Sequence, residues 1–293
     1  MTDAEPLRAA PLGAIAVTGT DAADFLRAQL TNDVMRLGPN RHFLAAWCDA
    51  KGRTQMVARV CEYEGAYLLI VPRELIPALI KRLRMFVLRA KVDVADMSDS
   101  LRIEGVTGGD LPVANRCEKQ GIHTLLGLPA GSKDTPRALV LAPADSDDSL
   151  AGAVSADSDE WERSEIDSGL PSIFGATQGL FVPQMLNLHW LMAIDFDKGC
   201  YPGQEVIARL HYRGTLSRRM FRLEWQGRPP APGDDVLDEA GERQGTVVRC
   251  APSASDNSSG TALAVLKVRA ADNALATPDT RLSLLDLPYP TPA

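Results

Sequence analysis

After Thr215 the sequence takes on a pattern that few folds can satisfy. Short strand-like runs alternate there with turns rich in Pro, Gly, Asp and Ser. The runs cover residues 220–225, 244–248, 262–268 and 281–285. Short strands separated by turn residues are typical of antiparallel sheets that close on themselves. We therefore predict a small antiparallel β-barrel over residues 215–293.

The N-terminal part mixes helix and strand signals. Residues 72–88 place Leu75, Leu79 and Leu83 on one face of an amphipathic helix. A second helix is expected over residues 22–30, after a cap at Thr20 or Asp21. Short β-prone runs predict strands at 14–17, 43–48, 56–61, 66–71 and 92–95. This part reads as one unit of mixed strands and helices.

A second unit begins near Leu101 and includes a strand at 138–141. Residues 144–158 are rich in Asp, Ser and Ala and are expected to form a solvated loop. A helix is expected to follow over 161–166. Since 293 residues exceed what one small core can organise, we predict an α+β protein of three units. These units are residues 1–98 with part of 165–214, residues 99–164, and residues 215–293.

Composition excludes several classes of function. The net charge of -7 disfavours direct binding to nucleic acid, because phosphates require positive charge. No apolar run of about 18 residues occurs, so no membrane span is expected. The acidic start of the chain does not resemble a secretory or transit signal, which makes the cytoplasm the expected location. The five cysteines form no C-x-x-C pair and the four histidines are widely spaced, so we expect no metal site.

Cys200 is the candidate for reactive chemistry. Pro202 suits the first turn of a helix, and Val206, Ile207 and Leu210 continue that helix with an apolar stripe. A thiol just before a helix N-terminus is activated as a thiolate, because the helix dipole and free N–H groups stabilise negative charge. The alternative from the residues alone is a buried, unreactive cysteine.

The cysteine segment also resembles a family signature. Residues 198–209 read Lys-Gly-Cys-Tyr-Pro-Gly-Gln-Glu-Val-Ile-Ala-Arg and resemble the signature of the YgfZ family, the folate-binding relatives of the glycine-cleavage T-protein. Residues 181–188, residues 19–34 and the Cys-Asp-Ala-Lys-Gly-Arg run at 48–53 resemble further family segments in the same order. The resemblance covers roughly residues 10–290. It implies a T-protein-like fold with ferredoxin-like sheets in its two α+β units.

The resemblance also implies a site for tetrahydrofolate or a derivative in the centre of the three units. Asn32 and Asp33 are then expected at the edge of the cavity, and Trp161 is expected to line the pterin or benzoyl region. Gln184 and Asn187 are expected to supply amide hydrogen bonds. The alternatives from the residues alone are a core role for Trp161 and helix capping by the two amides.

The cysteine segment adds further expected folate contacts. These are Lys198, Tyr201, Gln204 and Glu205, with Cys200 as the candidate catalytic residue. Gln204 and Glu205 are also ordinary first-turn helix residues, and Glu205 suits the positive end of the helix in any case.

Two departures from the family pattern bear on function. Residues 12–14 lack a tryptophan that relatives can carry, and residues 52–57 lack the carboxylate with which the transferases engage folate. The resemblance therefore implies a folate-binding accessory protein for the assembly or repair of iron–sulfur enzymes, including those that modify tRNA. Its partners would be folate and iron–sulfur client or assembly proteins. The alternatives are a folate-dependent aminomethyl or one-carbon transferase, and an interaction protein with a vestigial pocket. Turnover and oligomeric state stay open.

Overall fold

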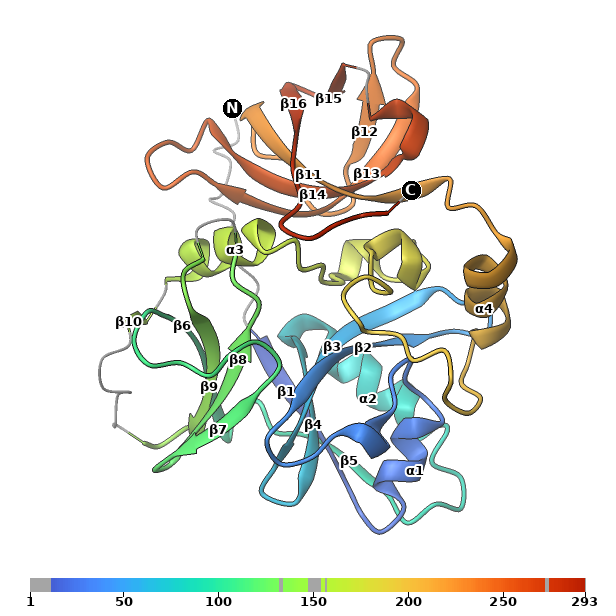
Figure 1. The fold of residues 1–293 in the computed structure, drawn as a ribbon, viewed down its shortest axis with the longest axis vertical. Coiled ribbons are helices and arrows are strands. Elements are labelled where there is room, and N and C mark those ends of the chain that lie inside the picture. Colours follow the sequence, from blue (N-terminus) through green and yellow to red (C-terminus); the bar gives the residue numbers. More distant parts are fainter. Residues whose placement is uncertain (1–11, 132–133, 147–153, 156, 272–273, 293) are drawn as a thin grey trace.

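The computed structural model describes residues 12–131, 134–146, 154–155, 157–271 and 274–292 of the chain. Three sheets organise it (Figure 1). The first is antiparallel and has the strand order β2-β3-β4-β1-β5. Its strands are β1 (Leu12–Thr18), β2 (His42–Cys48), β3 (Thr54–Tyr63), β4 (Ala66–Pro72) and β5 (Asp93–Asp96).

Strand β1 is buried on both faces, and its side chains explain the layers on either side. Ile15 and Val17 pack into the core under the helices, whereas Ala14 and Ala16 face the second sheet. Side chains alternate along a strand, and the two small alanines allow the second sheet to approach closely. The first sheet is therefore the middle layer of this half of the molecule.

The predicted strands of the first unit all form, and its helices are shorter than expected. Helix α1 spans Ala22–Arg27. The helix predicted over 72–88 divides into a 3-10 turn at Arg73–Leu75 and helix α2 at Ile76–Arg84. The segment after α2 leaves the helical path, and Leu88 has a φ of 44°. Apolar periodicity alone extended the predicted helix beyond its physical end.

The second sheet has the order β10-β6-β9-β8-β7. Its strands are β6 (Leu101–Thr107), β7 (Cys117–Gln120), β8 (His123–Leu128), β9 (Arg137–Pro143) and β10 (Val154–Ser155). The hairpin of β7 and β8 was missed, because β7 exposes three of its four residues and so lacks an alternating apolar pattern. Most of the loop expected at 144–158 lies outside the described residues.

The C-terminal strands close into the predicted barrel, in the order β11-β14-β13-β12-β15-β16. They are β11 (Arg218–Gly227), β12 (Asp235–Asp238), β13 (Arg243–Pro252), β14 (Ser259–Lys267), β15 (Leu275–Thr277) and β16 (Thr280–Leu285). The two strands that sequence patterns missed, β12 and β15, have 4 and 3 residues and are too short to show a period.

Two helices connect these layers. Helix α3 (Ser158–Asp167) crosses between the second sheet and the barrel and packs against β13 and β14 (Figure 1). The chain then returns to the first unit, because residues between Ile166 and Ile207 join the core that contains β1 and α2. Helix α4 (Gln204–Arg213) lies on the flank of the molecule beside β2 and β3 (Figure 1). No helix among the described residues is long and apolar enough to cross a membrane.

Candidate functional site

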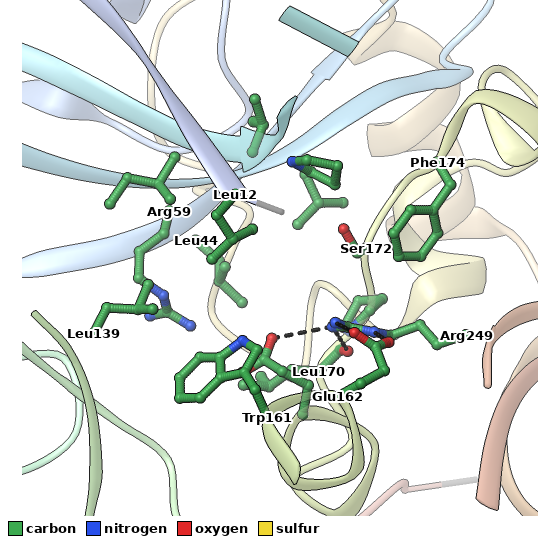
Figure 2. A pocket seen from close by; sticks show the side chains of 16 residues that line it. Leu12, Leu44, Arg59, Leu139, Trp161, Glu162, Leu170, Ser172, Phe174 and Arg249 are labelled. Carbon is green, nitrogen blue, oxygen red and sulfur yellow. Dashed lines mark hydrogen bonds and ion pairs between the residues drawn. The ribbon is translucent and has the colours of Figure 1, made fainter. Parts of the chain in front are cut away.

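A cavity lies where the first sheet, the second sheet, α3 and the barrel meet (Figure 2). It contains about 600 Å³ of empty space when the open mouth is counted, and about 50 Å³ of it admits the centre of a water molecule. Apolar side chains form much of its wall, among them Leu12, Val57, Ile70, Leu139, Leu170 and Phe174. A small group of charged residues from three elements completes the wall.

Arg249 reaches the cavity because strand β13 contains an irregularity. The register with β14 shifts between Val247 and Arg249. Val247 and Cys250 point into the barrel, whereas Val248 and Ala251 pack outside it in the core of the first unit. A bulge bends a strand and redirects a side chain. Arg249 is thereby turned out of the barrel interior and into the shared cavity.

Arg249 joins two glutamates of α3. Its Nε donates to Oε1 of Glu162 at 2.5 Å, and its Nη2 donates to Oε2 of Glu162 at 2.7 Å. Its Nη1 donates to Oε2 of Glu165 at 3.0 Å and to the Leu170 carbonyl at 3.0 Å. Arg137 of β9 forms an ion pair with the other oxygen of Glu165. All four oxygens of these two carboxylates are therefore bound by an arginine. Glu162 is bound by Arg249 alone, and Glu165 is bound by Arg249 and Arg137.

The network determines the charge state of its members. Burial alone would raise the pKa of Glu165, but Arg137, Arg249 and Arg59 together lower it below the ordinary value. Burial likewise opposes the charge of Arg249, yet its contacts with Glu162 and Glu165 raise its pKa above the ordinary value. The carboxylate of Glu165 and the guanidinium of Arg249 are thus charged at neutral pH.

Arg59 enters the cavity from the middle of β3, two residues after Val57, which lines the same wall. Its Nη1 donates to Nδ1 of His42 at 3.1 Å, and the other nitrogen of that ring lies 2.8 Å from the Gly127 carbonyl. Burial, and then the charge of Arg59, lowers the pKa of His42 to about 3. His42 is therefore neutral at physiological pH. Its Nε2 carries the proton that the carbonyl accepts, which leaves Nδ1 as the acceptor for Arg59.

Trp161 lines the cavity from the first turns of α3 and is 9% exposed. The Arg137 guanidinium carbon lies 4.7 Å from the centre of its ring. On the sheet side, a Cβ at Gly105 would come within 1.9 Å of the indole, so only glycine permits this approach. The indole is held firmly between β6 and Arg137, and its nitrogen edge turns toward the cavity (Figure 2).

Asn32 and Asp33 lie in the loop after α1 and do not line the cavity. Nδ2 of Asn32 donates to the Leu44 carbonyl at 3.0 Å and to the Met192 carbonyl at 2.9 Å. Asp33 pairs with Nε of Arg27 at 3.3 Å. These groups tie the loop to β2 and to the segment that precedes Cys200.

Lys198 and Tyr201 also belong to this junction. Nζ of Lys198 donates to the carbonyls of Leu30, at 2.6 Å, and of Arg27. It lies 4.8 Å from the centre of the Tyr201 ring. Burial lowers the pKa of Lys198 to about 8 and raises the pKa of Tyr201. Lys198 is thereby bound to α1 and the loop after it, and Tyr201 is buried beside Lys198.

Gln184 and Asn187 are buried and serve the backbone. Nε2 of Gln184 donates to the Ile207 carbonyl at 2.7 Å, which fastens the segment to α4. Nδ2 of Asn187 donates to the Met220 carbonyl at 3.0 Å, which fastens it to the barrel. Asn187 adopts a φ of 58°, a left-handed conformation that asparagine tolerates better than most residues.

Cys200 is exposed, whereas the other four cysteines are buried. It precedes α4, which begins at Gln204 and has Glu205 in its first turn. Gly203 has a φ of 80°, and a Cβ there would lie 2.5 Å from the Cα of Gly52. The cysteine segment therefore docks tightly on the first hairpin turn and not on the central cavity. Among the predicted site residues, Trp161 alone lines that cavity.

Four charged residues of the cavity were not predicted from the sequence as site residues, namely Arg59, Glu162, Glu165 and Arg249. Arg59 and Arg249 did carry a signal, because each is a charged residue with an apolar neighbour on either side in its strand. The two glutamates resembled ordinary helix residues. Their partners come from units that lie far apart in the sequence.

Comparisons with known proteins agree with the fold and the family resemblance. No protein-family model matches the chain. A tRNA-modifying protein YgfZ from Yersinia pseudotuberculosis is 34% identical, over 94% of this chain and 89% of that protein. One from Cronobacter sakazakii is 32% identical, over 79% of this chain and 76% of its own length.

A solved structure extends the comparison to the fold. The glycine cleavage system aminomethyltransferase T from Bartonella henselae superposes with a TM-score of 0.69 at 16% identity, covering 96% of this chain and 84% of that one. The predicted α+β fold of the T-protein type, with its C-terminal barrel, is thus confirmed. The extent and identity of the sequence matches show that the chain belongs to the YgfZ family.

Proposed function

We propose that this protein binds a reduced folate in the cavity between its three units and thereby supports the assembly or repair of iron–sulfur enzymes, including enzymes that modify tRNA. The cavity itself, with Trp161 and a buried charged network in one wall, carries the proposal. Curated relatives are named tRNA-modifying proteins, and the similar structure is a glycine-cleavage aminomethyltransferase.

The residues of the cavity suit a folate. Binding sites for small molecules typically combine apolar walls with a few fixed polar groups. A pteridine ring offers a flat apolar face together with hydrogen-bond donors and acceptors at its edge. Leu139 and Phe174 supply apolar contact, and Arg59 supplies donors.

Cys200 lies outside the cavity, so its role in this proposal is separate from folate binding. Its thiol is exposed and does not line the cavity, which supports contact with a protein partner rather than a covalent step on bound folate. The network of hydrogen bonds from Lys198, Asn32 and Gln184 holds the segment that presents it. In this proposal these residues act by positioning the cysteine segment.

The alternative is a folate-dependent aminomethyl or one-carbon transferase, and the carboxylates of the cavity are the observation in its favour. Residues 52–57 lack the carboxylate with which the transferases engage folate, yet Glu162 and Glu165 line the cavity. However, arginines bind both side chains and lower the pKa of Glu165. A carboxylate stabilised in its charged form is a poor general base. The accessory role is therefore the better supported of the two.

The first experiment measures binding of 5-formyltetrahydrofolate by calorimetry to the wild type and to Trp161→Ala. Trp190→Ala is the matched control, since Trp190 lies outside the cavity. Binding that weakens in Trp161→Ala and persists in Trp190→Ala supports the proposal. Absence of binding to the wild type would sink both the accessory and the transferase readings.

The second experiment distinguishes the accessory role from the transferase activity. A strain that lacks the protein is complemented with the wild type, with Cys200→Ser and with the buried-cysteine control Cys117→Ser. The activity of an iron–sulfur enzyme that modifies tRNA is then measured. Loss of complementation in Cys200→Ser alone supports a partner-facing thiol. Aminomethyl transfer to tetrahydrofolate by the purified protein would instead favour the transferase.

A further inference from the structure

Arg59 has an unusual environment for a charged side chain. It is 6% exposed, and its guanidinium projects into the cavity from the apolar strand β3 (Figure 2). A guanidinium carries five N–H donors. Within the part of the chain that the structure describes, one of its nitrogens is hydrogen-bonded, through Nη1 to His42. The donors on Nε and Nη2 have no protein acceptor among those residues.

His42 orients this side chain but does not neutralise it. Its ring is neutral, and its other nitrogen donates to the Gly127 carbonyl, so the contact with Arg59 is a single neutral hydrogen bond. Cys61 and Cys117 interact electrostatically with Arg59, and burial raises the pKa of both thiols. They too are neutral at physiological pH. Burial lowers the pKa of Arg59 to about 10, which leaves it charged at that pH.

The carboxylates of the cavity are already occupied. Both oxygens of Glu162 accept from Arg249, and Glu165 accepts from Arg249 with one oxygen and from Arg137 with the other. Three arginines therefore face two glutamates, and one positive charge of the cluster is unmatched. A buried charge without a partner is costly, so a site that keeps one is prepared for an oppositely charged ligand.

We propose that Arg59 is the recognition residue for a carboxylate group of the ligand in this cavity, with Nε and Nη2 donating to its two oxygens. The side-on pair of guanidinium donors matches the geometry of a carboxylate. The indole Nε1 of Trp161, which also turns toward the cavity and has no acceptor among the described residues, offers a further donor. This assignment rests on the proposed function, because the carboxylate would belong to a ligand that occupies the same cavity.

Two sources can supply such a carboxylate. One is the glutamyl tail of a folate, and the other is a small organic acid that binds beside the folate. Three probes distinguish them: p-aminobenzoyl-L-glutamate, which has carboxylates and no pteridine; 6-methyltetrahydropterin, which has a pteridine and no carboxylate; and acetate. Binding of each is measured by calorimetry to the wild type, Arg59→Met, Arg59→Lys and the control Arg116→Met, whose side chain is exposed.

We expect Arg59→Met to weaken binding of a carboxylate probe by tenfold to a hundredfold, on the order of what charge-assisted hydrogen bonds contribute. Arg59→Lys should recover part of the loss, since it restores the charge without the paired donors. Binding of 6-methyltetrahydropterin should be unchanged. Dependence on Arg59 for p-aminobenzoyl-L-glutamate identifies the folate tail as the source, and dependence for acetate alone identifies a separate acid.

The inference is overturned if the carboxylate probes bind the wild type and Arg59→Met equally, if neither carboxylate probe binds the wild type, or if the pterin probe loses affinity as much as they do. A native thermal transition in both Arg59 variants shows that any loss is not unfolding. Failure of the proposed function looks different. In that case 5-formyltetrahydrofolate does not bind the wild type, while acetate binds and still depends on Arg59.

Discussion

Arg249 of the barrel holds Glu162 of α3 through two nearly parallel hydrogen bonds, Nε to Oε1 at 2.5 Å and Nη2 to Oε2 at 2.7 Å. The side chains are 6% and 8% exposed. This pair joins two units that are separated by 87 positions in the sequence. It also closes the polar side of the cavity, so its removal tests how strongly the units depend on one another.

Replacement of Glu162 by leucine should lower the free energy of unfolding by about 3–5 kcal/mol, because it leaves Arg249 buried without its main partner. The double variant Glu162→Leu with Arg249→Met should recover much of this loss, since it also removes the charge that Glu162→Leu leaves without its main partner. Urea unfolding measures both. The control is Asp235→Ala, which breaks the exposed pair with Arg243 at 2.8 Å and should cost under about 1 kcal/mol. Equal losses in Glu162→Leu and Asp235→Ala would contradict the prediction.

The neutral state of His42 should make stability depend on pH on the acid side. Its pKa in the folded protein is about 3, below the ordinary value of about 6.5 in the unfolded chain. As the pH falls from about 6.5 toward 3, the unfolded chain takes up a proton that the folded protein refuses, so stability falls. The full effect is on the order of 5 kcal/mol, since one pKa unit corresponds to about 1.4 kcal/mol.

His42→Gln should flatten this dependence, and urea unfolding across the same pH range measures it. A weaker dependence of stability on pH should remain in His42→Gln, because burial also lowers the pKa of His189, to about 4. His211→Gln is the control and should retain the steep fall, because it leaves His42 in place. A wild-type curve as flat as that of His42→Gln would refute the assignment.

The contact between Gly105 and Trp161 should be intolerant of a methyl group. A Cβ at Gly105 would lie 1.9 Å from the indole, so Gly105→Ala must displace the ring or the strand. Overpacking of this kind typically costs about 1–3 kcal/mol. Thermal unfolding should show the loss for Gly105→Ala and none for Gly38→Ala, since the site at Gly38 is open. Similar transitions in the two variants would show that Trp161 is more loosely held than the structure indicates.

The thiol of Cys200 should react with a thiol reagent much faster than the other four thiols. Cys200 is exposed and the other four are buried. Burial raises the pKa of Cys48 and of Cys117 to about 12, and it raises those of Cys61 and Cys250 as well. Because the thiolate is the reactive form, an aromatic disulfide reagent should modify one thiol quickly in the native protein. Cys200→Ser should abolish the fast phase and Cys61→Ser should preserve it. A second fast thiol in the native protein would contradict this division.

Much of the architecture was predictable because it is local. Alternating apolar residues and Gly-, Pro- or Asp-rich turns placed the strands of the first unit and four of the barrel strands. Strand β7 and the short strands β12 and β15 escaped, because they expose most of their side chains or have too few residues for a period. The helix predicted over 72–88 was too long for a different reason, because the apolar periodicity continues past Arg84, where helix α2 ends.

The sequence by itself determined the family, the C-terminal barrel and the position of Cys200 before a helix, because each of these depends on residues that are neighbours in the chain. Only the tertiary structure decided which side chains face the cavity. Arg59, Glu162 and Arg249 come from three different elements, and a bulge in β13 turns the last of them outward. Asn32, Gln184 and Lys198, which the resemblance assigned to folate, donate to backbone carbonyls. The direction of a polar side chain depends on which hydrogen-bond acceptor lies next to it in space. That acceptor can be far away in the sequence, and only the packed structure brings the two groups together.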